Sequence, residues 1–340
     1  MIFFPIYGKI KSNSSEVRRL DALINFDSIE VKSTIKILLQ DKSTKKNIIW
    51  ATDTYSDNGI FFADNEEITE DLVSGAYSKI IQPRVYKAFE EQSSRTRKHA
   101  EVFTPSWICN LMNNYCDEEW FGRKDVFNCQ KDKHRETNKE KIYFPDGKTW
   151  KDYVDSRRLE ITCGEAPYIV SRYDTTTGDM IPTEDRIGIL DRKLRIVNEN
   201  AVDDAEWLKW TMRAFQSVYG FEYQGDNVLV ARINLLMTFV DYYKERFKAA
   251  PEIQTLKKIA NIIAWNIWQM DGLKGTVPLG KPQEEVQQLS WFGDISNSIS
   301  DSETPLFEQT ISADEGTECM IYDWRADRSI KYSELKKGRK

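Results

Sequence analysis

The sequence predicts an α/β fold built on a parallel, doubly wound sheet, and three observations support this prediction. Short apolar runs end at an acidic residue three times, at Glu160, Glu222 and Asp271. A turn of small residues follows the first acid, and a long segment with helical apolar spacing follows the second. In doubly wound sheets the carboxyl ends of the strands share one edge, where ligands bind. Each acid alone is more often a turn residue, but three in series favour a binding site.

The first acid precedes the stretch around which the chain is organised. Residues 159–168 comprise Leu-Glu-Ile-Thr-Cys-Gly-Glu-Ala-Pro-Tyr, with the small residues Thr162, Cys163 and Gly164 in the turn. A turn of this kind lets a ligand approach the backbone, and we expect a helix to begin at Ala166. One glycine in a turn is a weak signal for a cofactor by itself.

The second acid lies 62 residues after the first (222 − 160). In doubly wound folds an acid at the end of the second strand accepts hydrogen bonds from ribose hydroxyls, about 20 residues after the first turn. The longer spacing requires an insertion, which residues 174–205 supply. We expect a third strand over 259–267 that leads to Asp271, and a further short strand over 320–324.

A helix start precedes this region at Thr104 and Pro105. Threonine before proline, followed by apolar residues at helical spacing, is typical of a capped amphipathic helix. The structural interpretation is only that helix. The functional interpretation is that Phe103 and Thr104, at the mouth of the helix, contact a ligand.

Residues 1–92 are predicted to form a separate mixed α+β domain, and residues 93–340 the second domain. Strands are expected over 31–39 and 47–52, and a helix over 85–92. Four acids close together in the first domain would suit a nuclease site, but no acid-x-lysine pair follows them, which makes that site improbable. These acids are Asp53, Asp57, Asp64 and Glu66.

Composition limits the class of protein. The chain has 340 residues, of which 40% are hydrophobic and 30% charged, as in globular proteins. No run of about 18 apolar residues occurs, so no membrane span is expected. The five cysteines are scattered, and there are only two histidines. We therefore expect reduced thiols, no metal site and a cytoplasmic location.

The charge is unevenly distributed. A net charge of −6 does not favour a protein that coats DNA, but a local basic groove stays open. Basic clusters at 42–46, 95–99, 131–141 and 336–340 are each more often solvated loops than phosphate contacts. The stretch 131–141 is expected to be a surface loop.

Four stretches together resemble the adenine-specific DNA methyltransferases of restriction-modification systems, and in particular their restriction endonuclease subunit M proteins. The stretches are Glu-Val-Phe-Thr-Pro at 101–105, Leu-Glu-Ile-Thr-Cys-Gly-Glu-Ala-Pro at 159–167, Gly-Phe-Glu-Tyr-Gln-Gly-Asp-Asn at 220–227 and Asn-Ile-Trp-Gln-Met-Asp at 266–271. The resemblance covers most of residues 80–335. It implies a Rossmann-like methyltransferase fold and S-adenosylmethionine (SAM) as the methyl donor.

The resemblance also implies roles for nine residues. Three would pack on the cofactor, four would surround its amino-acid part, one would hold the ribose and one would lie near the adenine amine. Those that would pack on the cofactor are Phe103, Thr104 and Pro105, and those that would surround its amino-acid part are Glu160, Thr162, Cys163 and Gly164. Glu222 would hold the ribose, and Asp271 would lie near the adenine amine. The sequence departs from the family where the turn usually ends in a second glycine, at Ala166, and where an aspartate usually leads it, at Glu160.

The catalytic element of the family is absent. That element is Asn or Asp, two prolines and an aromatic residue, and it holds the flipped adenine. No such tetrapeptide occurs in the chain, so it resembles the front half of a methyltransferase without catalytic residues of its own. The resemblance then implies DNA and a second protein subunit as partners. Alternatively, residues 280–335 cover the sheet edge and leave a stable monomer.

Three functions stay open. The first is the SAM-binding subunit of a split DNA adenine methyltransferase. The second is a non-catalytic, methyltransferase-like module that binds DNA or regulates another protein. The third is an enzyme of another class, such as a nuclease, on a nucleotide-binding fold.

Overall fold

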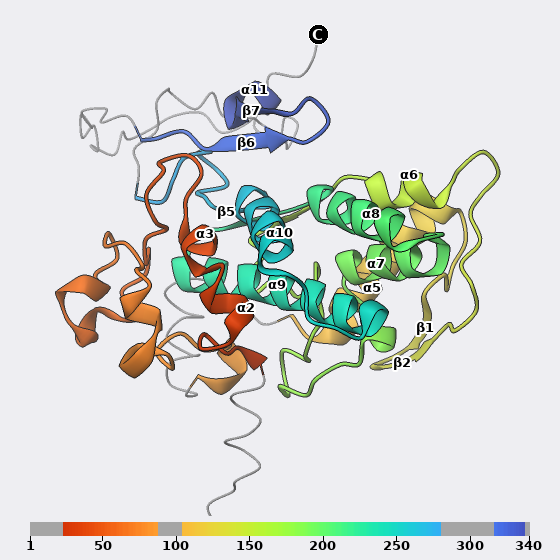
Figure 1. The fold of residues 1–340 in the computed structure, drawn as a ribbon, viewed down its shortest axis with the longest axis horizontal. Helices are drawn as coiled ribbons and strands as arrows, with labels where there is room; N and C mark the ends of the chain where they lie inside the picture. Colours follow the sequence, from red (N-terminus) through yellow and green to blue (C-terminus); the bar gives the residue numbers. More distant parts are fainter. Residues whose placement is uncertain (1–22, 88–103, 280–315, 337–340) are drawn as a thin grey trace, which may run out of the picture.

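The computed structural model describes residues 23–87, 104–279 and 316–336 of the chain (Figure 1). Its centre is a parallel sheet of three strands in the order β3-β4-β5. The strands are β3 (Arg158–Ile161), β4 (Val218–Glu222) and β5 (Ile267–Gln269). The register places Glu160 beside Gly220 and Glu222 beside Gln269, so the carboxyl ends lie at one edge. The prediction of an α/β fold with a parallel sheet is confirmed.

Long helices connect these strands and cover one face of the sheet. Between β3 and β4 lie α7 (Ile189–Asn200) and α8 (Asp204–Gln216). Between β4 and β5 lie α9 (Gly225–Phe247) and α10 (Ile253–Asn266). Helix α9 is apolar and buried along most of its length, as expected for a helix inside a core. Before β3 come α5 (Ser106–Phe121) and α6 (Trp150–Asp155).

Among the described residues, the opposite face is only partly covered. The antiparallel hairpin of β6 (Met320–Asp323) and β7 (Arg328–Lys331), followed by α11 (Tyr332–Lys336), lies on the far side of β5 from α9 (blue in Figure 1). Cys319 and Ile321 pack there against Phe221, Trp268 and Met270. Residues 316–336 thus cover β4 and β5.

The N-terminal residues are helical where strands were predicted. Helices α2 (Ile29–Lys32) and α3 (Ile35–Leu39) replace the strand expected over 31–39. β-Branched composition suggested a strand, but Ile35, Leu38 and Leu39 are buried at helical spacing, and α3 packs against α10. The stretch 47–52 forms only isolated antiparallel bridges. Short 3₁₀ turns complete this region: Ser56–Asn58, Ile60–Phe62, Asp71–Val73, Gly75–Tyr77 and Arg84–Tyr86.

The region 23–87 shares one buried cluster with the helices that cover the sheet. Phe26, Trp50 and Ile68 belong to the same core as residues of α9 and α10. The predicted domain boundary near residue 92, and most of the helix expected over 85–92, lie outside the described residues.

Three further predictions were wrong. The strand expected over 259–267 is mostly α10, because the buried Leu256, Ile259, Ala260 and Ile263 form a helical stripe. The loop expected over 131–141 contains the hairpin of β1 (Asn128–Lys131) and β2 (His134–Thr137). No helix begins at Ala166, since turns continue until α7, apart from the 3₁₀ turn Thr183–Asp185. The strand expected over 320–324 is confirmed as β6.

Across the three described ranges, every helix is too short or too polar to cross a lipid bilayer.

Candidate functional site

The turn after β3 contains three residues with positive φ. These are Thr162 (φ 56°), Gly164 (φ 54°) and Ala166 (φ 67°). Only glycine adopts this region without a steric cost, and a β-branched residue there is a marked outlier. Ala166 therefore places a methyl group where glycine is favoured. Strained backbone persists where its surroundings fix it, and such strain often occurs at ligand sites.

Gly164 leaves space on one side of this turn. A Cβ atom added there would meet no atom of the described residues within 4 Å. The other side of the turn packs on the sheet, because a Cβ at Gly220 would lie 3.0 Å from the sulfur of Cys163. The turn is therefore anchored through Cys163 and open at Gly164.

Glu222 joins the end of β4 to this turn. Its Oε2 accepts the backbone N–H of Gly164 at 2.8 Å, and its Oε1 accepts those of Tyr223 and Gln224 at 3.0 Å each. Burial raises the pKa of this carboxyl, whereas the three backbone hydrogen bonds oppose the rise. Glu222 is 7% exposed, so this acid is a structural link in the protein as well as the predicted ribose ligand.

Glu160 lies beside this link, on the neighbouring strand β3. Its side chain faces the helix-covered side of the sheet, and its Oε2 is buried without a hydrogen-bond partner among the described residues. Burial and the nearby Glu222 carboxylate raise the pKa of Glu160 well above its ordinary value. A cationic or hydroxyl-bearing group would stabilise the ionised form.

The thiol of Cys163 lies in the same environment. Burial, with the carboxyls of Glu160 and Glu222, raises the pKa of Cys163 well above its ordinary value. The thiol therefore stays protonated and is a poor nucleophile. Its contribution is packing.

Helix α5 and the residue before its N-cap contact the loop that follows this turn. The carbonyl of Thr104 accepts a hydrogen bond from the hydroxyl of Thr175 at 3.1 Å. Asn113 of α5 donates to the carbonyl of Tyr168 at 2.9 Å. Helix α5 begins after Pro105, which is its N-cap, so the side-chain cap predicted at Thr104 is absent. Phe103 lies outside the described residues.

Asp271 caps the loop that follows β5. Its Oδ1 accepts the backbone N–H groups of Leu273 and Lys274, each at 3.1 Å. Its Oδ2 lies 3.6 Å from the ammonium of Lys274. These contacts are those of a turn residue. The loop nevertheless lies at the shared edge, because Met270 donates its N–H to the carbonyl of Glu222 at 2.8 Å.

The N-terminal region contributes residues that the sequence did not indicate. Gln269 of β5 exchanges two hydrogen bonds with the backbone of Ile49, at 2.9 and 2.7 Å. Gly225 donates to the carbonyl of Trp50, and a Cβ at Gly225 would lie 1.9 Å from the carbonyl oxygen of Ile49. Residues 49–50 thus lie against the carboxyl ends of β4 and β5. A contact across 220 residues leaves no periodic signal in the sequence.

A buried ion pair lies in the first turn of α9. Asp226 accepts hydrogen bonds from the hydroxyl of Tyr55 at 2.8 Å and the ammonium of Lys87 at 3.0 Å. Asp226 and Lys87 are both almost completely buried. The pair ties the N-terminal region to the same edge of the sheet.

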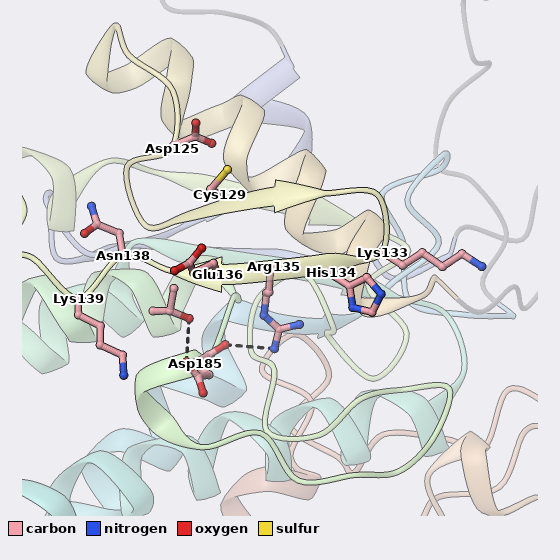
Figure 2. Close-up of a pocket in the computed structure, with 10 residues that line it drawn as sticks. Asp125, Cys129, Lys133, His134, Arg135, Glu136, Asn138, Lys139 and Asp185 are labelled. Carbon is pink, nitrogen blue, oxygen red and sulfur yellow. Dashed lines mark hydrogen bonds between the residues drawn. The ribbon is translucent and has the colours of Figure 1, made fainter.

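A surface hollow of about 980 Å³ lies elsewhere, along the β1–β2 hairpin. Figure 2 shows its lining side chains on both strands. The hydroxyl of Thr137 donates a hydrogen bond to the carboxylate of Asp185, and Arg135 donates one to the backbone carbonyl of Asp185. The hollow is lined by equal numbers of cationic and anionic side chains. The cations are Lys133, Arg135 and Lys139; the anions are Asp125, Glu136 and Asp185. This hollow has no charge preference and shares no lining residue with the predicted site, so we assign it no ligand.

Within the described ranges, no three histidine, cysteine, aspartate or glutamate residues are arranged to hold a metal ion. Comparison of the chain with protein-family models, curated proteins and solved structures found no match.

Proposed function

We propose that this chain is the SAM-binding subunit of a split DNA adenine methyltransferase of a restriction-modification system, and that a second chain supplies catalysis. One observation carries this proposal. Stretches separated in the sequence converge at the carboxyl edge of a parallel sheet: the turn at Gly164, the acid Glu222, and Cys109 in the first turn of α5, whose thiol is close enough to Glu160 for that carboxyl to raise its pKa. This edge is where doubly wound folds bind nucleotides.

The strand order supports the same proposal. If β3, β4 and β5 are numbered first, second and third along the chain, their order across the sheet is 3-2-1. That is the first half of the doubly wound order 3-2-1-4-5-6, in which the ligand lies where the order reverses, beside the first strand. The first strand here is β3, and the strained turn follows it.

The residues of the turn fit the methionyl end of SAM. The unpartnered Oε2 of Glu160 would accept the ammonium group, and the open side of Gly164 would let the ligand approach the backbone. Glu222 holds the turn through the N–H of Gly164, and a carboxylate with three donors keeps one further acceptor position for a ribose hydroxyl. Thr104 and Pro105 would border the cofactor beside the turn.

SAM supplies the methyl group when bound, and this chain orients it. In the proposed reaction the partner would hold a flipped adenine with its amine directed at the donor, and Glu160 and Glu222 would hold the donor in place. The described residues perform no proton transfer in this scheme, because Glu160 and Glu222 bind and position the donor. DNA contacts then belong to the assembled complex.

A second candidate is a non-catalytic, methyltransferase-like module. The observation that favours it is the engagement of Glu222 by three N–H groups of its own chain, at 7% exposure. In that case the acid would only stabilise the turn, and no cofactor would be needed.

Calorimetric titration of SAM into the purified chain separates the two candidates. Under the first, SAM binds at about one per chain, and Glu160→Gln weakens it about tenfold or more, since a charged hydrogen bond contributes about 1.5–3 kcal/mol. The exposed Glu66→Gln is the matched control and leaves the affinity unchanged. If SAM binds neither the isolated chain nor the chain purified with its partner, the non-catalytic module is favoured.

A further inference from the structure

Within the part of the chain that the structure describes, strand β3 lies at the edge of the sheet and exposes apolar side chains. Its neighbour on one side is β4, and no described residue pairs with its other side. Leu159 and Ile161 are 52% and 61% exposed, although residues 316–336 cover the same face over β4 and β5. An open edge with apolar side chains is a template for pairing with another strand.

The backbone groups on this edge are also available. Arg158 donates its N–H to Ser217, so Arg158 and Glu160 direct their backbone groups towards β4. Alternate residues of a parallel strand point the opposite way, so the N–H groups of Leu159 and Ile161 face outwards. Apolar side chains and outward-facing N–H groups therefore belong to the same two residues.

The inward-facing side chains of β3 carry polar atoms for which the described residues provide no partner. Nε and Nη2 of Arg158 and Oε2 of Glu160 are buried and accept or donate no hydrogen bond among the described residues. Buried polar groups normally have partners, and a buried guanidinium most often pairs with a carboxylate. An element added beside β3 would bring acceptors towards Arg158.

The topology selects the direction of that element. In the order 3-2-1-4, the next strand lies beside the first and runs parallel to it. A second copy of this chain related by a two-fold axis perpendicular to the sheet would present β3 antiparallel to itself, because such an axis reverses the strand direction. The occupant that continues the sheet is therefore a different strand.

We propose that the free edge of β3 is the docking site of the partner subunit, which adds a parallel strand with apolar side chains opposite Leu159 and Ile161 and an acidic side chain near Arg158. This inference rests on the proposed function, since the partner is the chain that carries the catalytic element.

Site-specific photo-crosslinking tests this in the cells from which the gene comes. The full chain carries the substitution Ile161→p-benzoylphenylalanine, and the control carries Val202→p-benzoylphenylalanine, at an apolar residue 85% exposed in the loop after α7. Mass spectrometry identifies the crosslinked peptide. The expected adduct at position 161 is with an apolar strand of a second protein, and it is absent at position 202.

Replacement of the edge residues provides the second measurement. Leu159→Lys and Ile161→Lys should each lower recovery of that protein with the tagged chain about tenfold or more, whereas Val202→Lys should not. Both edge side chains are exposed, so thermal melting and SAM titration of the variants should match the unchanged chain.

Four results would overturn the proposal: an adduct within the same chain, an adduct with a second copy, no adduct, or the same adduct at both positions. Its failure is distinguishable from failure of the proposed function. If the crosslinked protein lacks an Asn/Asp-Pro-Pro-aromatic element, the docking edge stands and the methyltransferase assignment fails. If SAM binds but no second chain docks at β3, the cofactor half stands and the docking edge fails.

Discussion

The carboxylate of Glu222 accepts the backbone N–H of Gly164 at 2.8 Å and so joins the ends of two neighbouring strands. The contact spans 58 residues and fixes the position of a turn whose backbone is strained. The same acid is the predicted ribose ligand. Its loss would therefore affect stability and binding together, and each effect needs its own measurement.

Glu222→Gln should destabilise the protein by about 2–3 kcal/mol. The amide can present only one acceptor oxygen, and its NH₂ group would face an N–H donor in a buried site. Urea unfolding measures the change, with the exposed Glu66→Gln as the control. An equal effect in both variants would show that the three hydrogen bonds of Glu222 contribute little.

Glu160→Gln should make the protein more stable at pH 8 than the unchanged chain. The folded pKa of Glu160 is raised above the ordinary 4.5, so the folded state binds more protons than the unfolded state above that pH. Stability is then lost as pH rises from about 4.5 through the folded pKa. Unfolding at pH 5 and pH 8 should show a smaller decline in Glu160→Gln. If the loss of stability between pH 5 and pH 8 is the same in both proteins, it arises from other groups, such as Glu222.

SAM binding should release protons at pH values below the raised pKa of Glu160. An ammonium beside Glu160 favours its ionised form, so affinity should rise as pH increases through the raised pKa of the ligand-free protein. Calorimetry in two buffers of different ionisation enthalpy measures the proton count. Glu160→Gln should abolish the release. Release that persists in this variant would place the titrating group elsewhere.

Thr162→Gly should stabilise the protein by about 1 kcal/mol. Thr162 is exposed at φ 56°, a region that costs a β-branched residue about 1–2 kcal/mol and glycine almost nothing. The greater freedom of glycine in the unfolded chain offsets part of this gain. The control Thr317→Gly, at an exposed threonine without positive φ, should be destabilising. Thermal unfolding compares them.

Arg232→Lys should destabilise the protein by about 3 kcal/mol. The buried guanidinium donates to the carbonyls of Leu38, Gln40, Ala264 and Ile267, and an ammonium cannot reach all four. Burial lowers the pKa of Arg232 to about 10. Urea unfolding, with the exposed Arg325→Lys as control, measures the loss. A change below about 1 kcal/mol would show that water replaces these contacts.

The sequence predicted the parallel sheet because local signals encode it. Apolar runs that end at Glu160 and Glu222 are strands β3 and β4, and the helical spacing after Glu222 is α9. The prediction failed where composition competed with spacing. Ile35, Leu38 and Leu39 are β-branched or apolar, but their spacing buries one face of a helix.

The surroundings of the candidate site could not be predicted, because distant residues form them. Nothing near Ile49 indicates that Gln269 will bind its backbone, and nothing near Glu222 indicates the Gly164 contact. The positive φ of Thr162 and Ala166 also contradicts their local preferences. Asp271 does follow the third strand, but its carboxylate caps its own loop.

The contact between Arg232 and the carbonyl of Leu38 joins residues 194 positions apart. During synthesis, α2 and α3 leave the ribosome long before the helices against which they pack. Contacts of such large sequence separation slow folding, because chain entropy is lost before the contacts form. Leu38 and Leu39 therefore stay exposed until α9 and α10 have been synthesised. During this interval the nascent chain is most prone to aggregate.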